Sequence, residues 1–131
     1  MRASDKKNKK HRVLNDPDLA TSEHDKIMLW LEANLEKILG EKPTRVVWEY
    51  PILERMSRSE AIVGFADLWA DSTYFEVKSQ IRSVGEVIRQ IRYYEHFTGG
   101  YGPWVVVAPP GPYGEIFERQ RIRFVAYIEN A

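Results

Sequence analysis

The apolar positions of this chain change their spacing along the sequence, and the changes predict which segments are helices and which are strands. Between about residues 22 and 39 they recur every three or four positions, the period of a helix with one buried face. Thr21 or Ser22 can cap this helix, and Gly40 and Pro43 end it. Its predicted buried stripe consists of Ile27, Met28, Leu31, Leu35 and Ile38.

Three runs rich in β-branched and aromatic residues follow, and they predict consecutive strands. They are RVVWEYPIL, AIVGFADLWA and YFEVKSQ, separated by polar stretches. A second helix is predicted from about residue 84 to residue 97 and ends at Gly99 and Gly100. PWVVVAPP is fully apolar, as expected of a strand buried at the centre of a sheet. PPGPYG then predicts a loop, and IRFVAYI predicts a final strand.

Composition narrows the class of protein. The chain has 131 residues, of which 44% are apolar and 12% aromatic, enough for one packed domain. Cysteine is absent, which excludes disulfides, thiolate zinc sites and cysteine-ligated iron–sulfur clusters. No apolar run approaches the roughly 18 residues of a membrane span, and the basic N-terminus lacks the apolar stretch of a signal peptide. We therefore expect a soluble, cytoplasmic protein with no membrane partner.

Charge is distributed unevenly, although the formal net charge is zero. The first twelve residues carry six basic side chains and one acid, Asp5, so this arm has a charge of +5 and the rest of the chain −5. We predict a basic, disordered arm over residues 1–16 and a single domain over residues 17–131. The arm is either a solubilising tail or a phosphate-contacting segment. Its basic residues are Arg2, Lys6, Lys7, Lys9, Lys10 and Arg12.

The second and third predicted strands carry the candidate chemistry. If they form a hairpin turning at Asp71 and Ser72, the numbers of cross-strand partners sum to 143, which places Asp67 opposite Glu76 on one face. Like charges at paired positions destabilise a sheet, so two facing carboxylates favour a cation between them. Lys78 returns to the same face. Two carboxylate ligands for a hard divalent cation, beside an ammonium, are suited to attack on a phosphodiester.

The order helix, three strands, helix, strand resembles the PD-(D/E)xK, or restriction-endonuclease-like, nuclease superfamily over roughly residues 22–110. The fragments GFAD, FEVK and QIRYY are most similar to its RecB-like branch, whose pattern is Gly-x-x-Asp, an acid-x-Lys and Gln-x-x-x-Tyr. The resemblance implies an α/β fold with an αβββαβ core, in which helices flank a mixed central sheet. The matching residues are Gly64, Asp67, Glu76, Lys78, Gln90 and Tyr94.

The resemblance also implies roles for the residues of the two strands. Asp67 and Glu76 would hold Mg²⁺ or Mn²⁺ with the main-chain carbonyl of Val77. Lys78 would orient the attacking water and offset charge on the phosphoryl oxygens. The alternative for Lys78 is a surface ion pair with Glu76, which would contribute little to stability.

The first helix offers two candidates for a further metal ligand, because the RecB-like branch usually supplies a histidine there and other branches a glutamate. His24 lies in line with the apolar stripe, whereas Glu23 falls on its flank. We therefore expect His24 to be the ligand. The alternatives are a core histidine satisfied by a main-chain group and, for Glu23, an acid that stabilises the positive end of the helix.

The second helix carries the remaining candidates. Gln90 and Tyr94 are one turn apart and share a face, so they could orient Lys78 and the DNA backbone. Without the resemblance, the pair would be interpreted as a solvated glutamine and a core tyrosine. Basic and aromatic residues beside the site would suit phosphates and an unstacked base. The predicted DNA-contacting residues are Arg82, Arg89, Arg92 and Tyr93, with Lys6, Lys7, Lys9 and Lys10 of the arm.

The sequence therefore predicts a metal-dependent deoxyribonuclease, an exonuclease or endonuclease whose products carry 5′-phosphate and 3′-hydroxyl ends, as the resemblance implies. One alternative is a Holliday-junction resolvase of the same fold, which would act as a homodimer. The alternative from another class is a DNA-binding accessory module that keeps the fold without turnover. The strandedness of the substrate is left open.

Overall fold

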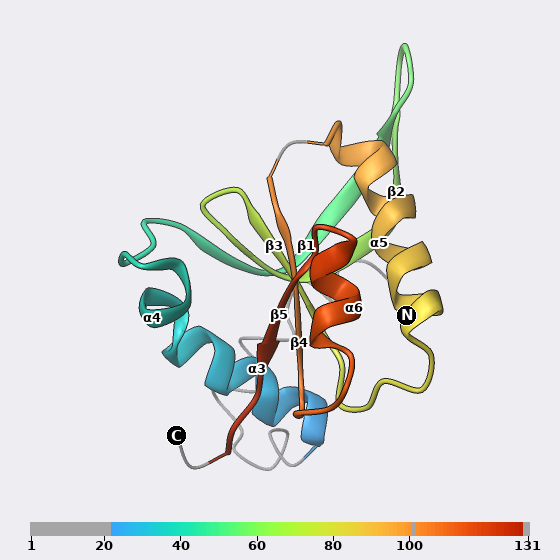
Figure 1. The fold of residues 1–131 in the computed structure, drawn as a ribbon. Coiled ribbons are helices and arrows are strands. Elements are labelled where there is room, and N and C mark those ends of the chain that lie inside the picture. The colour runs from blue at the N-terminus through green and yellow to red at the C-terminus, as the bar shows by residue number, and fades with distance from the viewer. Residues whose placement is uncertain (1–21, 101, 130–131) are drawn as a thin grey trace.

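The described part of the chain forms an α/β structure around one five-stranded sheet (Figure 1). This computed structural model describes residues 22–100 and 102–129, and the predicted basic arm lies outside them. The helix, three strands, helix and strand of the prediction follow one another in that order, and a further helix and strand come after them. The elements are α3 (Glu23–Ala33), α4 (Leu35–Leu39), β1 (Val46–Arg55), β2 (Glu60–Ala70), β3 (Thr73–Val77), α5 (Val84–Thr98), β4 (Trp104–Ala108), α6 (Gly114–Arg119) and β5 (Arg123–Ala126).

The sheet is mixed and has the strand order β1-β2-β3-β4-β5. Its first three strands pair antiparallel, whereas β3, β4 and β5 pair parallel. Helices α3 and α4 cover one face, and α5 and α6 cover the other (Figure 1). All five residues of β4 are buried, because this strand lies inside the sheet and is covered on both faces. The prediction of a mixed sheet flanked by helices is therefore confirmed.

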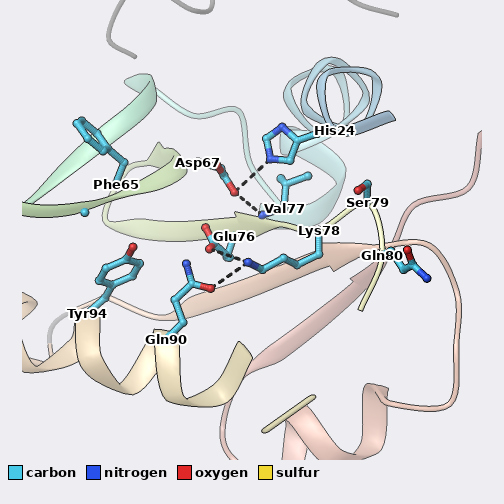
Figure 2. A pocket seen from close by; sticks show the side chains of 11 residues that line it. His24, Phe65, Asp67, Glu76, Val77, Lys78, Ser79, Gln80, Gln90 and Tyr94 are labelled. Atoms are coloured by element: carbon cyan, nitrogen blue, oxygen red, sulfur yellow. Dashed lines mark hydrogen bonds and ion pairs between the residues drawn. The ribbon is translucent and has the colours of Figure 1, made fainter. Parts of the chain in front are cut away.

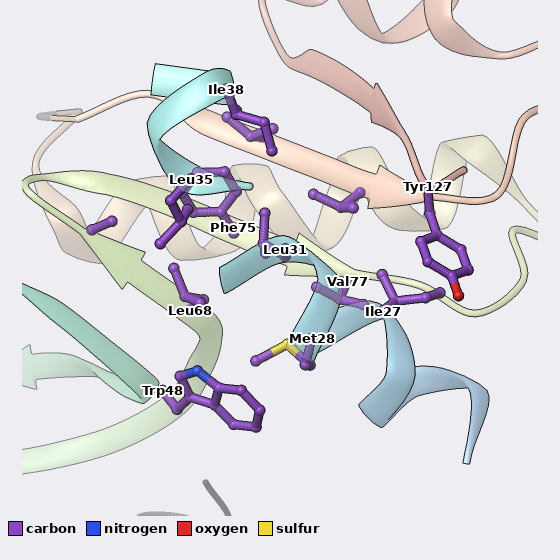
Figure 3. Packing of buried hydrophobic residues seen from close by; sticks show 13 residues of the cluster. Ile27, Met28, Leu31, Leu35, Ile38, Trp48, Leu68, Phe75, Val77 and Tyr127 are labelled. Atoms are coloured by element: carbon purple, nitrogen blue, oxygen red, sulfur yellow. The ribbon is translucent and has the colours of Figure 1, made fainter. Parts of the chain in front are cut away.

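The first helix buries the predicted stripe but is not continuous. Ser22 caps α3, and its hydroxyl accepts a main-chain N–H of the first turn. The helix is interrupted at Asn34, whose side chain donates to the carbonyl of Trp30 at 2.8 Å. Asparagine competes with the main chain in this way, so the prediction of one helix to about residue 39 is wrong. The buried stripe, packed against the sheet in Figure 3, is Ile27, Met28, Leu31, Leu35 and Ile38.

The C-terminal part differs from the prediction. Helix α6 lies between the PPGPYG loop and the last strand, and its six residues are too few to reveal a helical period in the sequence. Phe117 anchors this helix, because its side chain is fully buried and stacks on Phe124 with ring centroids 6.0 Å apart. Two strands are also shorter than predicted, since β3 ends at Val77 and β5 covers only Arg123–Ala126.

The hairpin of β2 and β3 has the predicted register. Its three ladder pairs have numbers that sum to 143, and the last pair is Leu68 with Phe75. Asp71 and Ser72 make the turn with φ values of 46° and 80°, the left-handed conformation that a tight two-residue hairpin turn requires. The Asp71 carboxylate also accepts three hydrogen bonds of 2.8–2.9 Å from the segment before β1, which fixes the turn to the body of the protein.

The turn is a position where one substitution should increase stability. We expect Ser72→Gly to raise the free energy of unfolding by about 1 kcal/mol, because a left-handed conformation costs non-glycine residues about 1–2 kcal/mol and the extra chain entropy of glycine offsets part of the gain. Urea unfolding would measure the change. Ser59→Gly is the matched control, since Ser59 lies in the other hairpin without a positive φ. An equal gain at Ser59 would contradict the explanation.

Candidate active site

The predicted catalytic and metal-binding residues come from α3, β2, β3 and α5 and meet in one cleft of about 360 Å³ (Figure 2). All seven of them line it. Their side chains converge from both covering layers of the sheet, His24 from α3 and Gln90 and Tyr94 from α5. The full lining is His24, Gly64, Phe65, Asp67, Glu76, Val77, Lys78, Ser79, Gln80, Gln90 and Tyr94.

The cleft lies where β2 and β3 separate. The regular ladder ends at Leu68 and Phe75, one position before Asp67 and Glu76, so these two acids do not form the main-chain pair that the register predicts. Instead, Oδ2 of Asp67 accepts the N–H of Val77 at 2.8 Å. A side-chain carboxylate thus takes the place of a main-chain acceptor, and the two strands open around it.

Strands β1 and β2 are both distorted next to Asp67. Ala66 packs under α5 and Leu68 under α3, although residues two apart on a regular strand share one face. On β1, the regular pairing is interrupted at Glu49, which has a φ of 54°. The local twist turns Asp67 out of the regular strand and toward α3.

The two carboxyl groups of the cleft have pKa values shifted in opposite directions. Burial, followed by the charge of Asp67, raises the pKa of Glu76 well above its ordinary value, and Lys78 offsets this only in part. Burial also opposes ionisation of Asp67, but His24, Glu76 and the N–H of Val77 hold the pKa of Asp67 below its ordinary value. Without a cation, Asp67 therefore carries the negative charge, while Glu76 keeps its proton to a higher pH than an exposed glutamate.

The first helix brings His24 to the site. Its Nε2 lies 3.5 Å from Oδ2 of Asp67, and its Nδ1 lies 3.8 Å from a carboxylate oxygen of Asp25. The imidazole is 30% exposed, so it faces the cleft and is not a core histidine. Glu23 is exposed and does not line the cleft. The structure thus places His24, and not Glu23, beside the carboxylates.

Lys78 is held between an acid and an amide. Its Nζ donates to Oε1 of Gln90 at 2.9 Å and lies 3.5 Å from Oε2 of Glu76 (Figure 2). The main-chain N–H of Lys78 still bonds to Val107 of β4, which fixes the base of the side chain. The side chain is 28% exposed, so the ammonium is positioned but remains accessible from the cleft.

Gly64 and Tyr94 fit together at the other end of the cleft. A Cβ on Gly64 would lie 2.5 Å from Cε1 of Tyr94, closer than such atoms can approach. The Tyr94 ring also stacks on Trp104, with centroids 5.6 Å apart. A glycine at this position of β2 therefore lets α5 place its tyrosine against the strand.

We expect Gly64→Ala to lower the free energy of unfolding by about 1–3 kcal/mol, because the new methyl group must displace the Tyr94 ring. In the double variant with Tyr94→Ala, the cost of the added methyl should be smaller than in the wild type. Urea unfolding of the four proteins would test this coupling. Gly85→Ala is the control, since the nearest atoms to a Cβ there would be Nη1 of Arg89 at 3.6 Å and Oγ of Ser83 at 3.9 Å, both ordinary contacts. Additive effects at Gly64 and Tyr94 would contradict the explanation.

None of the predicted DNA-contacting residues that the structure describes lines the main cleft. Arg82 lines a smaller cleft of about 210 Å³ that shares Lys78 and Gln90 with the main one. Arg92 instead bonds to Glu95 at 2.7 Å and to the main-chain carbonyl of Gln120, which ties α5 to the end of α6. Arg92 is thus engaged within the protein, and its contact with DNA stays a prediction. Of the others, Arg89 and Tyr93 are exposed outside the cleft, and Lys6, Lys7, Lys9 and Lys10 lie outside the described residues.

Three lining residues were not among the candidates. Phe65, Ser79 and Gln80 have no ionisable group and no fixed place in the motif, although each directly follows a motif residue or its neighbour. Adjacency to Gly64 and Lys78 was the available signal. A regular strand places neighbouring side chains on opposite faces, and Ser79 and Gln80 both reach the cleft because the chain leaves the sheet after Val77.

The donor groups of the cleft suit a hard divalent cation. No three His, Asp or Glu side chains within residues 22–100 and 102–129 are arranged to hold an ion by themselves. Mg²⁺, however, commonly uses one or two protein carboxylates and keeps several waters. Asp67 and Glu76 offer such oxygens side by side, and a positive charge there would relieve the repulsion that raises the pKa of Glu76. The residues present therefore fit Mg²⁺ or Mn²⁺.

Comparison of the chain with models of protein families, with curated proteins and with solved structures finds no match. Among the residues that the structure describes, no helix is long and apolar enough to cross a membrane. The function must therefore be inferred from the residues of the cleft and their geometry.

Proposed function

We propose that the protein is a metal-dependent deoxyribonuclease with a restriction-endonuclease-like core of the RecB-like type. The observation that carries the proposal is the meeting of Asp67, Glu76 and Lys78 in one cleft, where the two carboxyl groups lie together and the Lys78 ammonium lies 3.5 Å from Glu76. The order of the elements supports the same assignment, as do the positions of Asp67 on β2, Glu76 on β3 and Lys78 directly after β3.

Asp67, Glu76, the main-chain carbonyl of Val77 and His24 would hold the metal ion. When bound, Mg²⁺ or Mn²⁺ would lower the pKa of a coordinated water and stabilise the charge that develops on the phosphate. Asp67 is ready to bind, because its carboxylate is already ionised. Glu76 would have to release its proton, so metal uptake should liberate protons and weaken at low pH.

The other residues of the cleft would position the substrate. Lys78 would hold the attacking water and offset charge on the phosphoryl oxygens, while Gln90 keeps its side chain directed into the cleft. Tyr94 forms a wall along which the DNA backbone can lie. In this arrangement the protein contributes positioning and charge, which are the main requirements of phosphodiester hydrolysis.

A time course on circular and linear DNA, each single-stranded and double-stranded, would test the proposal in Mg²⁺, in Mn²⁺ and in EDTA. We expect cleavage only with metal, and products that carry 5′-phosphate and 3′-hydroxyl ends. Loss of circular substrates would identify an endonuclease, and resistance of circles an exonuclease. Binding of all four substrates without cleavage in either metal would contradict nuclease activity and favour an accessory DNA-binding module.

The assignment of His24 makes a separate prediction. We expect His24→Ala to raise the metal concentration needed for half-maximal activity by about 10-fold or more, whereas the adjacent Glu23→Ala should have little effect. An imidazole suits Mn²⁺ better than Mg²⁺, so the wild type should be more active in Mn²⁺. Thermal unfolding at increasing Mn²⁺ would report affinity independently of turnover. The opposite ranking of the two variants would move the ligand by one residue.

A further inference from the structure

Another cleft of about 210 Å³, distinct from the one that Arg82 lines and called the second cleft below, lies between β1 and the C-terminal end of α5. Three aromatic side chains line it, Tyr50 and Tyr74 from the strands and Phe97 from the helix. Thr98 and Arg55 add polar groups. The volume corresponds to about seven water molecules of the liquid and is below the roughly 300–1,000 Å³ of pockets for larger ligands. The cleft therefore has room for a single flat ring and not for a large cofactor.

The second cleft is a neighbour of the main cleft, which holds Asp67, Glu76 and Lys78 and is called the active cleft below. On β1, Pro51 and Ile52 line the second cleft, and their cross-strand partners on β2, Phe65 and Gly64, line the active one. Paired strands lie about 4.8 Å apart. The two clefts thus adjoin across this strand pair, so one extended ligand can reach both.

Stacked rings also connect them. Tyr94 of the active cleft stacks on Trp104 with centroids 5.6 Å apart, and Trp104 stacks on Tyr74 of the second cleft at 4.9 Å. Tyr50 is in turn stacked on Trp69 at 5.0 Å. Because their neighbours hold these rings in place, the lining of the second cleft would lose little conformational freedom when a ligand binds.

We propose that the second cleft binds an unstacked nucleobase of a single-stranded stretch of the DNA strand held in the active cleft. This inference rests on the proposed nuclease function, which places a phosphate of that strand beside Lys78. Aromatic platforms bind bases of single strands without strong sequence preference, whereas the bases of a duplex are already stacked and paired. The substrate class would then be DNA with single-stranded segments.

Charge at the mouth of the cleft suits the same ligand. The Arg55 side chain is 78% exposed, and its Nη1 lies 2.8 Å from Glu60. This pair fixes one edge of the guanidinium, and the other N–H groups can bind a phosphate next to the inserted base. An apolar side chain of a protein partner would gain nothing from Arg55 or from the connection to the active cleft, so it is the less favoured occupant.

The test measures binding in EDTA, where no cleavage occurs, by fluorescence anisotropy of two labelled oligonucleotides. One is a short oligothymidylate, and the other is the same backbone with every base removed. We expect Phe97→Ala to weaken binding of the oligothymidylate by roughly tenfold and to leave binding of the abasic strand unchanged, because the lost contact is to a base. Ile116→Ala, an exposed position on α6, is the control and should change neither.

The proposal would be overturned if Phe97→Ala weakened the binding of both oligonucleotides equally, or the binding of neither. If Phe97→Ala fails to fold, Thr98→Trp provides the same comparison, since its ring would occupy the cleft from the end of α5. The test distinguishes failure of this proposal from failure of the nuclease proposal. Metal-dependent cleavage with no base-dependent effect would reject the second cleft alone, and a base-dependent effect without any cleavage would reject the nuclease alone.

Discussion

Lys78→Gln should reduce DNA cleavage by more than about 100-fold at saturating metal, because it removes the only ammonium that the structure places inside the cleft among the described residues. Glutamine retains hydrogen-bonding groups near Gln90 but cannot offset charge on a phosphoryl group. The fold should persist, since the side chain is partly exposed and contributes little packing. Asp67→Asn should cause a comparable loss, in this case through the metal ion, because it removes the ionised carboxylate.

Single-turnover cleavage at several Mg²⁺ and Mn²⁺ concentrations would separate the two effects. Lys78→Gln should remain inactive at every concentration, whereas additional metal should partly restore Asp67→Asn. Lys37→Gln, at an exposed position of α4, is the matched control and should cleave as the wild type does. Circular dichroism would verify folding of each variant. Unchanged rates in both site variants would contradict the assignment of the active site.

The parts of this structure that could be predicted from sequence depend on short-range patterns. The spacing of apolar residues such as Ile27 and Leu31 predicts the buried face of α3, because a helix repeats every 3.6 residues. The turn at Asp71 and Ser72 fixed the register of β2 and β3, because a two-residue turn permits one alignment. That register brings Asp67 and Glu76 to the same level of the two strands, one position beyond the last ladder pair.

The parts that could not be predicted depend on contacts between distant segments. The partner of Arg92 is the main chain of Gln120, 28 residues away, and no local pattern links the two. The twist that turns Asp67 away from regular pairing involves Glu49 on β1. Glu49 has a positive φ, which no pattern in the sequence predicts. Helix α6 depends on burial of Phe117 under the sheet and not on a period of its own.

The metal-free protein should become more stable when Glu76 is replaced by glutamine, by an amount that depends on pH. Burial and the charge of Asp67 raise the pKa of Glu76 in the folded state, whereas the unfolded chain ionises near the ordinary value of 4.5. Between these two values the folded state binds the additional proton, so the wild type loses stability as pH rises through that window. Each unit by which the folded pKa is raised costs about 1.4 kcal/mol. Glutamine is neutral at every pH and escapes this cost.

Thermal unfolding of Glu76→Gln and the wild type in EDTA, over a range of pH, would therefore give curves that coincide below pH 4.5 and diverge above it, with the variant the more stable protein. The lowered pKa of Asp67 acts in a separate window, because its contribution is lost only as pH falls below the ordinary value of 3.8. Saturating Mg²⁺ should reverse the order, since only the wild type keeps both carboxylates and gains binding free energy on folding. Parallel curves in EDTA would show that Glu76 ionises as an ordinary glutamate and that the two acids of the cleft are not coupled.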